Sequence, residues 1–461
     1  MMKRNAFGVL RSIVIIVTMA AALAATPARA QLAGDENIPA LAIELFGFND
    51  AQRLRAIERM AARGKTDIVA ALIEAMPYHP DAADQMAAAL RRLTGADIGA
   101  AWFDWMLWQE AHPEIKPFAG YAAFKGQYLS LIDPEFTRFI NPRQPHTIRL
   151  EEISWGGVIV DGIPALDNPE FTAAKDADWL GDNELVFGVA INGDARAYPH
   201  RIMDWHEMAN DVVGDVPVAL AYCTLCGAGI LFETQVPGRT EPLRFGSSGL
   251  LYRSNKLMYD QQTDSLWNQF TGMPVVGPLV GSGIVLGIRP LVVTRWGKWR
   301  AQHPDTKVLS LRTGHRRDYS PGKPYGDYFA KPGLMFPARL NDGRLAAKDI
   351  VFVLRLEGAV RAWPVKSFAG GKTIDARLGN VDIVLIGDAL TETVRAYRRD
   401  GLSFQFDAAG KHLIANGQIW TIEENALLGP DGRTLTRLPG HNAFWFAVQS
   451  YYPGGDVLAT P

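Results

Sequence analysis

An internal repeat of β-hairpins constrains the fold of this chain more than any other feature. Residues 186–199 (VFGVAINGDARAYP) align with residues 351–364 (VFVLRLEGAVRAWP). In each copy two apolar runs flank a short turn that ends in glycine, Asn192-Gly193 in the first and Glu357-Gly358 in the second. Such a turn between β-branched runs is typical of a hairpin. Because both copies reach a second apolar run further on, we predict two related β-rich halves that pack face to face.

The cysteines of the chain occur in only one of the two copies. The 461 residues contain two cysteines, Cys223 and Cys226, in a Cys-x-x-Cys-Gly sequence between two apolar runs. We align the second copy so that Ile386 to Thr391 lies opposite Tyr222 to Gly227, and it has no thiol. The apolar and turn residues of the scaffold recur in the second copy, whereas the cysteines and the polar residues near them do not. We therefore expect any functional site in the first half.

The rest of the chain predicts an α+β protein in which an all-α region precedes the β-rich, duplicated part. The hydrophobic fraction of 48% and the charged fraction of 21% are those of a globular protein rather than a disordered one. Region 38–140 has apolar residues at helical spacing, and its short helices between Gly or Pro turns resemble HEAT-type units. We assign 150–345 to the first half, with the cysteines, and 346–461 to a second, degenerate half.

The N-terminus predicts export. Residues 1–30 read as a signal peptide: a basic start, an apolar run over 13–25, and Ala28-Arg29-Ala30 before the cleavage point. The apolar run is shorter than the roughly 20 residues that span a bilayer. We therefore expect a periplasmic or secreted protein with no stable membrane insertion after cleavage. The formal net charge is −2, without blocks of like charge, which argues against a nucleic-acid partner.

A metal site is the leading interpretation of the cysteine pair. A Cys-x-x-Cys-Gly turn between strands is typical of zinc knuckles, whereas redox pairs of the thioredoxin type begin a helix. One knuckle supplies two ligands, and His206 is the nearest imidazole, 17 residues before Cys223. Two thiolates and one imidazole suit zinc with an open position, or copper if a methionine completes the set. We expect Cys223, Cys226 and His206 to bind zinc or copper, either to handle the metal or to support a metal-assisted reaction.

Two other functions stay open. The pair could be a thiol-disulfide oxidoreductase, because export permits oxidation and a disulfide between such closely spaced cysteines is exchangeable. Alternatively, the protein is a non-catalytic scaffold whose helical N-terminal region binds a protein partner while the cysteines only brace a turn. For His206 by itself, the competing interpretation is a core histidine bonded to a backbone carbonyl.

Two carboxylates are candidate catalytic residues beside the cysteines. Glu207 follows His206 directly, and Asp260 lies in a polar stretch that ends at Trp267. A carboxylate near a metal or a thiol can act as a general acid or base. The competing interpretation of Asp260 is structural, as a turn residue that bonds to the neighbouring Thr263 and Ser265.

Several of these motifs together resemble a known family, the bacterial and archaeal domain of unknown function 3179, over about 155–460. The segments that carry the resemblance are 197–199 (AYP), 205–211 (WHEMAND), 222–227 (YCTLCG), 248–252 (SGLLY), 258–260 (MYD) and 265–267 (SLW). The chain departs from the family at Thr224, where relatives commonly carry proline, which loosens the predicted turn. The resemblance implies no activity, because no function is assigned to that family.

Overall fold

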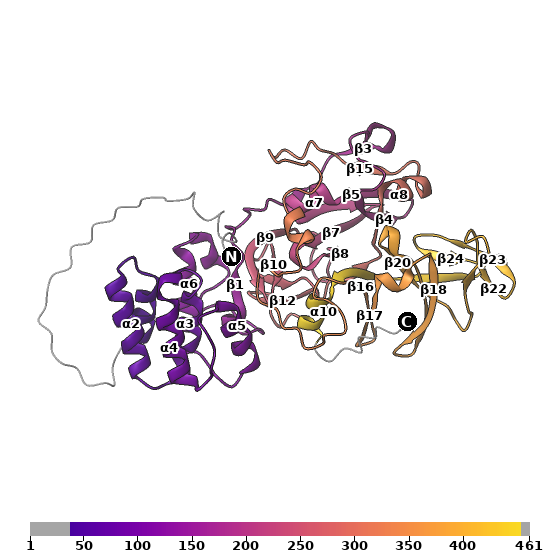
Figure 1. Cartoon of the computed structure of the whole chain (residues 1–461). Coiled ribbons are helices and arrows are strands. Elements are labelled where there is room, and N and C mark those ends of the chain that lie inside the picture. The colour runs from indigo at the N-terminus through magenta and orange to yellow at the C-terminus, as the bar shows by residue number, and fades with distance from the viewer. Residues whose placement is uncertain (1–36, 453–461) are drawn as a thin grey trace, which may run out of the picture. The chain divides into compact units, whose positions relative to one another are not determined.

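The computed structural model describes residues 37–452, and it confirms the α+β class: helices come first and several β-sheets follow (Figure 1). The predicted signal peptide, 1–30, lies outside the described residues. Within residues 37–452, no helix combines the length and the apolar character that crossing a membrane would need.

Six helices form the N-terminal region, and their boundaries follow local signals. Asn49 caps the second helix by accepting a hydrogen bond from the Gln52 amide at 3.0 Å, and Gly95 ends the fourth in the left-handed conformation. The HEAT-like arrangement stays a prediction. The helices are α1 (Ile38–Ile43), α2 (Asp50–Ala62), α3 (Val69–Ala75), α4 (Ala83–Thr94), α5 (Trp102–Ala111) and α6 (Tyr121–Ser130).

The helical region shares a hydrophobic core with the first β-sheet. Leu250 and Leu257 of that sheet belong to the same buried cluster as the apolar side chains of α2 to α6. Lys125, which is fully buried on α6, donates to Glu74 within the helices and to the Ile153 carbonyl at 2.6 Å on the first strand. The helices and the sheets are therefore parts of one compact unit, which begins at Ile38.

Three five-stranded sheets build the first half. The first contains, in spatial order, β1 (Ile153–Trp155), β9 (Phe245–Tyr252), β10 (Asn255–Asp260), β11 (Leu266–Asn268) and β12 (Met273–Val276). The second contains β13 (Ile288–Arg289), β8 (Ala228–Glu233), β7 (Val216–Cys223), β6 (Met208–Val213) and β2 (Leu166–Asp167). The third contains β14 (Val292–Arg295), β4 (Leu185–Ile191), β5 (Asp194–Pro199), β15 (Lys307–Leu309) and β3 (Phe171–Ala173). Three helices accompany them: α7 (His200–His206), α8 (Trp296–Gln302) and α9 (Gly326–Ala330).

The second half has a three-stranded and an eight-stranded sheet. The three strands are β17 (Ala359–Pro364), β16 (Ile350–Leu356) and β26 (Gly440–Phe444), and α10 (Trp445–Tyr451) follows the last. The eight strands are β18 (Lys372–Leu378), β19 (Val381–Asp388), β20 (Thr393–Arg398), β25 (Thr434–Leu438), β24 (Ala426–Leu428), β23 (Gln418–Ile422), β22 (Leu413–Ala415) and β21 (Gln405–Phe406).

The predicted repeat of hairpins is present. Strands β4 and β5 pair from Val186 opposite Pro199, and β16 and β17 pair in the same register from Val351 opposite Pro364. Both turns have two residues at positive φ, as a two-residue hairpin of this type requires. The repeat extends beyond the hairpin. In the first half β14 pairs with β4 and is followed by α8, and in the second half β26 pairs with β16 and is followed by α10.

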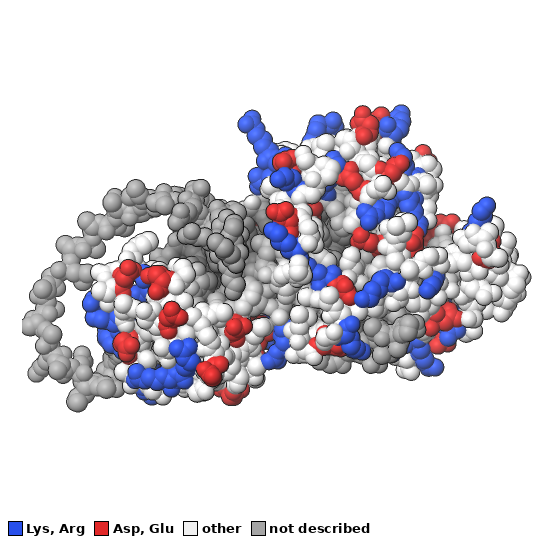
Figure 2. Space-filling view, in the orientation of Figure 1, with Lys and Arg blue, Asp and Glu red and all other residues white. Residues whose placement is uncertain are grey.

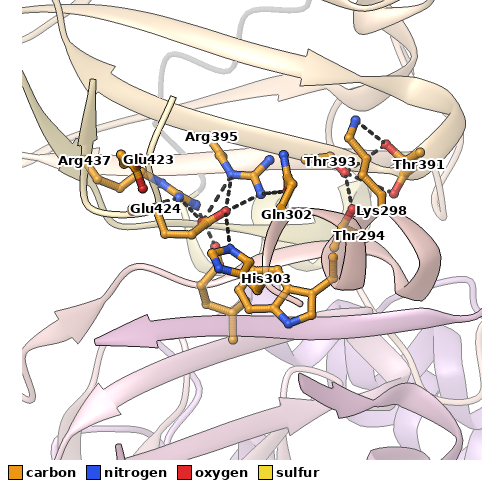
Figure 3. Close-up of polar contacts among 12 residues, drawn as sticks. Thr294, Lys298, Gln302, His303, Thr391, Thr393, Arg395, Glu423, Glu424 and Arg437 are labelled. Carbon is orange, nitrogen blue, oxygen red and sulfur yellow. Dashed lines mark hydrogen bonds and ion pairs between the residues drawn. The ribbon is translucent and has the colours of Figure 1, made fainter. Parts of the chain in front are cut away.

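Helix α8 of the first half packs beside a turn of the second half. Figure 3 shows α8 of the first half against the second, where the Lys298 ammonium lies 3.3 Å from Asp388 and Thr393 donates to Thr294 at 2.8 Å. Nearby, the Glu424 side chain, which is 11% exposed, lies between Arg395 and Arg437, and these guanidinium groups hold its pKa well below the usual range although desolvation opposes that shift.

We expect Gly188→Ala to lower the free energy of unfolding by about 1–3 kcal/mol, because overpacking a close-packed core forces side chains out of their rotamers. A Cβ at this position of β4 would lie 2.4 Å from the indole of Trp299, which is fully buried on α8. Urea unfolding measures the change. Gly99→Ala is the matched control, since a Cβ there meets nothing within 4 Å, and equal stability of the two variants would contradict this packing.

Candidate functional site

The cysteine pair lies in a tight turn between two antiparallel strands, as the sequence predicts. Strand β7 ends at Cys223, a 3-10 turn covers Thr224–Cys226, and Gly227 takes a positive φ of 58° before β8 begins. Both cysteines are free thiols with at most 2% of their surface exposed, and their sulfur atoms lie 2.8 Å apart. The backbone therefore holds the two sulfurs together in an interior with almost no solvent contact.

A strained hairpin holds polar groups against Cys226. Arg253 and Ser254, which connect β9 and β10, both have positive φ, a conformation that glycine adopts at lower cost. Their turn places the Ser254 carbonyl 3.4 Å from the Cys226 sulfur, and the Asn255 amide donates to the same sulfur at 3.3 Å. Gln269 fixes Asn255 by accepting a second hydrogen bond from it at 2.7 Å.

Burial separates the chemistry of the two thiols. It raises the pKa of the Cys226 thiol well above its usual value, and the neighbouring Cys223 raises it further. Cys226 therefore stays protonated at neutral pH. Of the two sulfurs, Cys223 is the more accessible, because its residue is 2% exposed whereas Cys226 is completely buried.

Glu207 joins this turn to two other elements. It ends α7 in the left-handed conformation, with φ of 54°, and its backbone carbonyl accepts from the Tyr222 amide at 2.8 Å. Its carboxylate accepts from the Thr224 hydroxyl at 2.7 Å and pairs with the Lys256 ammonium of β10 at 3.2 Å. All three side chains are buried. The structure thus places Glu207 beside the cysteines, as predicted, although its catalytic role stays a prediction.

A second buried carboxyl lies one turn earlier on α7. Asp204 is 7% exposed, and burial raises its pKa to about 8, with Glu207 adding to the shift and a hydrogen bond with Tyr222 opposing it. Among the described residues, its Oδ1 has no hydrogen-bond partner. His200 is partly buried, stacks on Phe187 with ring centroids 4.1 Å apart, and has its pKa lowered to about 3 by desolvation of its ring. Such groups are costly to bury, and they gather beside the cysteine turn.

The structure does not assemble the predicted metal ligands, because His206 points elsewhere. One ring nitrogen lies 2.8 Å from the Pro164 carbonyl, and the other lies 2.6 Å from the Tyr319 hydroxyl. The centre of its ring lies 5.3 Å from that of His315, at a tilt of 49°. Across residues 37–452, no three His, Cys, Asp or Glu side chains are grouped in a way that could hold a metal ion. The competing interpretation, a histidine bonded to a carbonyl, describes His206.

Asp260 also has a structural setting. One carboxylate oxygen accepts from the Thr263 amide at 2.7 Å, and the other accepts from the Thr263 hydroxyl at 2.7 Å and the Trp267 indole at 2.9 Å. These contacts stabilise the turn between β10 and β11 and the strand that follows. None of them joins Asp260 to the cysteines, so the structure does not bring this predicted catalytic residue into the site.

The corresponding turn of the second half shows what replaces the thiols. It runs from Asp388 at the end of β19 through a 3-10 turn, Ala389–Thr391, to Glu392 at a positive φ of 57°. The Thr391 hydroxyl donates to the Asp388 carboxylate at 3.1 Å, which matches the contact between the two sulfurs. Cys223 therefore corresponds to Asp388, and the predicted alignment at this turn is wrong by one residue.

Five polar residues of the site were not among the predicted site residues, and only Thr224 and Lys256 had a usable signal. Thr224 stands inside the Cys-x-x-Cys motif, where its hydroxyl bonds to Glu207. The others lie on distant strands or on α7 with no distinctive spacing, although a lysine in the apolar run of β10 is itself unusual. These four residues are Asp204, Asn255, Lys256 and Gln269.

The β-rich part of the chain matches one family model. That model, described as "Protein of unknown function (DUF3179)", covers residues 160–455, and the chain belongs to this family. The match includes the whole cysteine turn and both halves of the repeat. Comparison with curated proteins finds no match, and neither does comparison with solved structures.

We expect Asp204→Asn to flatten the dependence of stability on pH. Between about pH 4 and pH 8 the folded chain holds a proton on Asp204 that the unfolded chain has released. Raising the pH through this range therefore favours unfolding, by up to ~1.4 kcal/mol per pH unit. Urea unfolding at pH 5, 6, 7 and 8 gives the slope.

The matched control is Asp215→Asn, which changes an exposed aspartate on the turn between β6 and β7. Its stability is expected to follow the wild-type pH dependence. If Asp204→Asn also keeps the full wild-type slope, the carboxyl is ionised in the folded chain and the proposed burial effect is wrong.

Proposed function

We propose that this protein is an exported thiol-disulfide oxidoreductase that uses Cys223 and Cys226. The observation that supports this proposal best is the separation of 2.8 Å between their sulfur atoms within a cluster of buried polar side chains. Two sulfurs held this close can be joined by side-chain rotation, without a change in the strands that carry them. The predicted signal peptide leads to a compartment where disulfides form and persist.

The reaction has two steps. The Cys223 thiolate attacks a substrate disulfide, forms a mixed disulfide and releases one substrate sulfur as a thiolate, which takes up a proton. Cys226 then loses its proton and attacks the Cys223 sulfur, which closes the intramolecular disulfide and releases the second substrate thiol. The pair loses two electrons and the substrate disulfide gains them. The reverse sequence oxidises a substrate dithiol.

The surroundings of the pair fit these two roles. Cys226, whose surface is completely buried, is the resolving thiol, because it reacts only within the molecule. Its partners Asn255 and the Ser254 carbonyl hold it in place. Glu207 positions the turn through Thr224, and its pairing with Lys256 balances a carboxylate that would otherwise be buried alone.

Metal binding, the leading expectation from the sequence, has less support. The imidazole that was to complete the ligand set bonds to Pro164 and Tyr319. Two thiolates leave a zinc ion short of protein ligands. The scaffold hypothesis gains nothing from this geometry, because a brace for a turn needs no buried charges around it.

We expect the pair to cycle reversibly, with a reduction potential above about −300 mV, since less stable disulfides are the exchanging ones. Equilibration in glutathione buffers followed by mass spectrometry of alkylated protein measures this potential. Cys226→Ser is expected to trap a mixed disulfide with a small disulfide reagent at Cys223. Cys223→Ser is the matched control and is expected to trap far less.

Two outcomes would contradict the proposal. A potential below about −300 mV would mark an inert structural disulfide. Zinc or copper that copurifies at one ion per chain, and that is lost in Cys223→Ser, would favour metal binding instead. Elemental analysis of protein purified without a chelator separates these results.

A further inference from the structure

A long segment of the chain lies across the cysteine turn. We call residues 311–349 the strap; it leads from β15 to β16 and contains α9. Its first part is anchored on α7. There the Tyr319 hydroxyl lies 2.6 Å from His206, and the Trp205 indole donates to the Asp318 carbonyl at 2.7 Å. The histidine that the sequence marks as a metal ligand is thus an anchor for the strap.

The last part of the strap is anchored on the second half. Gln449 of α10 accepts from the amides of Asn341 and Asp342 at 2.7 and 2.9 Å and donates to the Asp342 carbonyl at 2.8 Å. Lys348 reaches back to α9, where its ammonium donates to the carbonyls of Tyr328 and Lys331 at 2.6 and 2.8 Å. The last part of the strap is therefore fixed on α10 through Gln449, whereas Lys348 is a tie that holds α9 in the closed position.

The middle of the strap contacts the cysteine turn through a tyrosine. The Tyr328 hydroxyl donates at 2.8 Å to the carbonyl of Leu225, which lies between the two cysteines. Ser254, whose carbonyl faces Cys226, donates its hydroxyl to the Pro337 carbonyl of the strap at 2.7 Å.

Outside these contacts, the middle of the strap is poorly packed. Phe329 and Met335 are 38% and 50% exposed, and most residues over 320–333 face solvent. A segment with few buried contacts opens locally at a lower free energy than the whole domain. The turn of the second half has no such cover among the described residues, since Leu390, which corresponds to Leu225, is 82% exposed. The strap is thus specific to the turn that carries the thiols.

We propose that the strap is a lid over the thiol pair: its middle, with α9, lifts from Leu225 while both anchors stay in place, and Cys223 reacts only then. The purpose of the lid rests on the proposed function, because a substrate disulfide must reach the sulfur of Cys223, a residue that is 2% exposed. The opening itself is a property of the fold and can be measured without any redox partner.

We expect Tyr328→Phe to raise the rate at which iodoacetamide alkylates Cys223 in the reduced, folded protein about five-fold. The variant keeps the ring and loses one hydrogen bond, whose usual net contribution corresponds to a factor of that size. Mass spectrometry of peptides resolves Cys223 from Cys226. Lys348→Ala, which frees the carbonyls of α9, is expected to raise the rate in the same direction.

The matched control is Tyr397→Phe, which loses the same kind of bond, from a tyrosine hydroxyl to the Glu423 carbonyl at 2.8 Å, away from the strap. Its alkylation rate should equal that of the wild type. Equal rates in Tyr328→Phe and Tyr397→Phe would overturn the lid. So would a wild-type rate that rises with urea as steeply as global unfolding, because Cys223 would then be reached only in the unfolded chain.

The lid and the proposed function can fail separately. If Cys223 of Tyr328→Phe is alkylated faster but the reduction potential of the pair lies below about −300 mV, the lid is supported and the exchange reaction is rejected. If the cysteine pair cycles reversibly but the alkylation rate of Tyr328→Phe equals that of the wild type, the exchange reaction is supported and the lid is rejected.

Discussion

The cysteine turn depends on a core that the two halves of the repeat share. Cys223 and Cys226 belong to one buried cluster with Val351 and Val353 of β16 and Trp445 of α10, so residues far along the chain complete their surroundings. Gly227, which ends the turn, lies against the Phe444 ring, where a Cβ would come within 3.1 Å. The second half, which has no thiols of its own, therefore helps to bury those of the first.

Within that apolar setting, the buried ionisable side chains are what favours a chemical function for the cysteine turn. A pair such as Glu207 and Lys256 gains little stability over an apolar replacement, because desolvation offsets most of the attraction. Asp204 is buried as a neutral carboxyl below about pH 8, because burial raises its pKa. A fold that needed only to close a turn would not require them. Their concentration around one dithiol is what favours chemistry there over a purely structural brace.

Prediction from the sequence succeeded where short-range pattern decides structure. The hairpins at 186–199 and 351–364, the α+β class and the turn at Cys223 all follow from alternating apolar runs and glycine turns, which act over a few residues. It failed where side chains have a choice of partners. His206 is near Cys223 in the sequence, but the end of α7 directs its ring toward Pro164 and Tyr319. Asp260 folds back onto Thr263 because that partner is three residues away.

The sequence by itself determined that the two cysteines occur in only one copy of a duplicated scaffold. A repeat, and the absence of a residue from one copy, can both be recognised by aligning the chain with itself. Only the tertiary structure decided what surrounds the two cysteines. The surroundings of the cysteine turn come from distant segments: the strap bonds to Leu225, Lys256 pairs with Glu207, and α10 packs in the same buried cluster as Cys223. No local spacing encodes contacts between segments so far apart in the sequence. The same packing gave His206 its place as an anchor of the strap, since a side chain bonds to the groups that the fold brings within its reach.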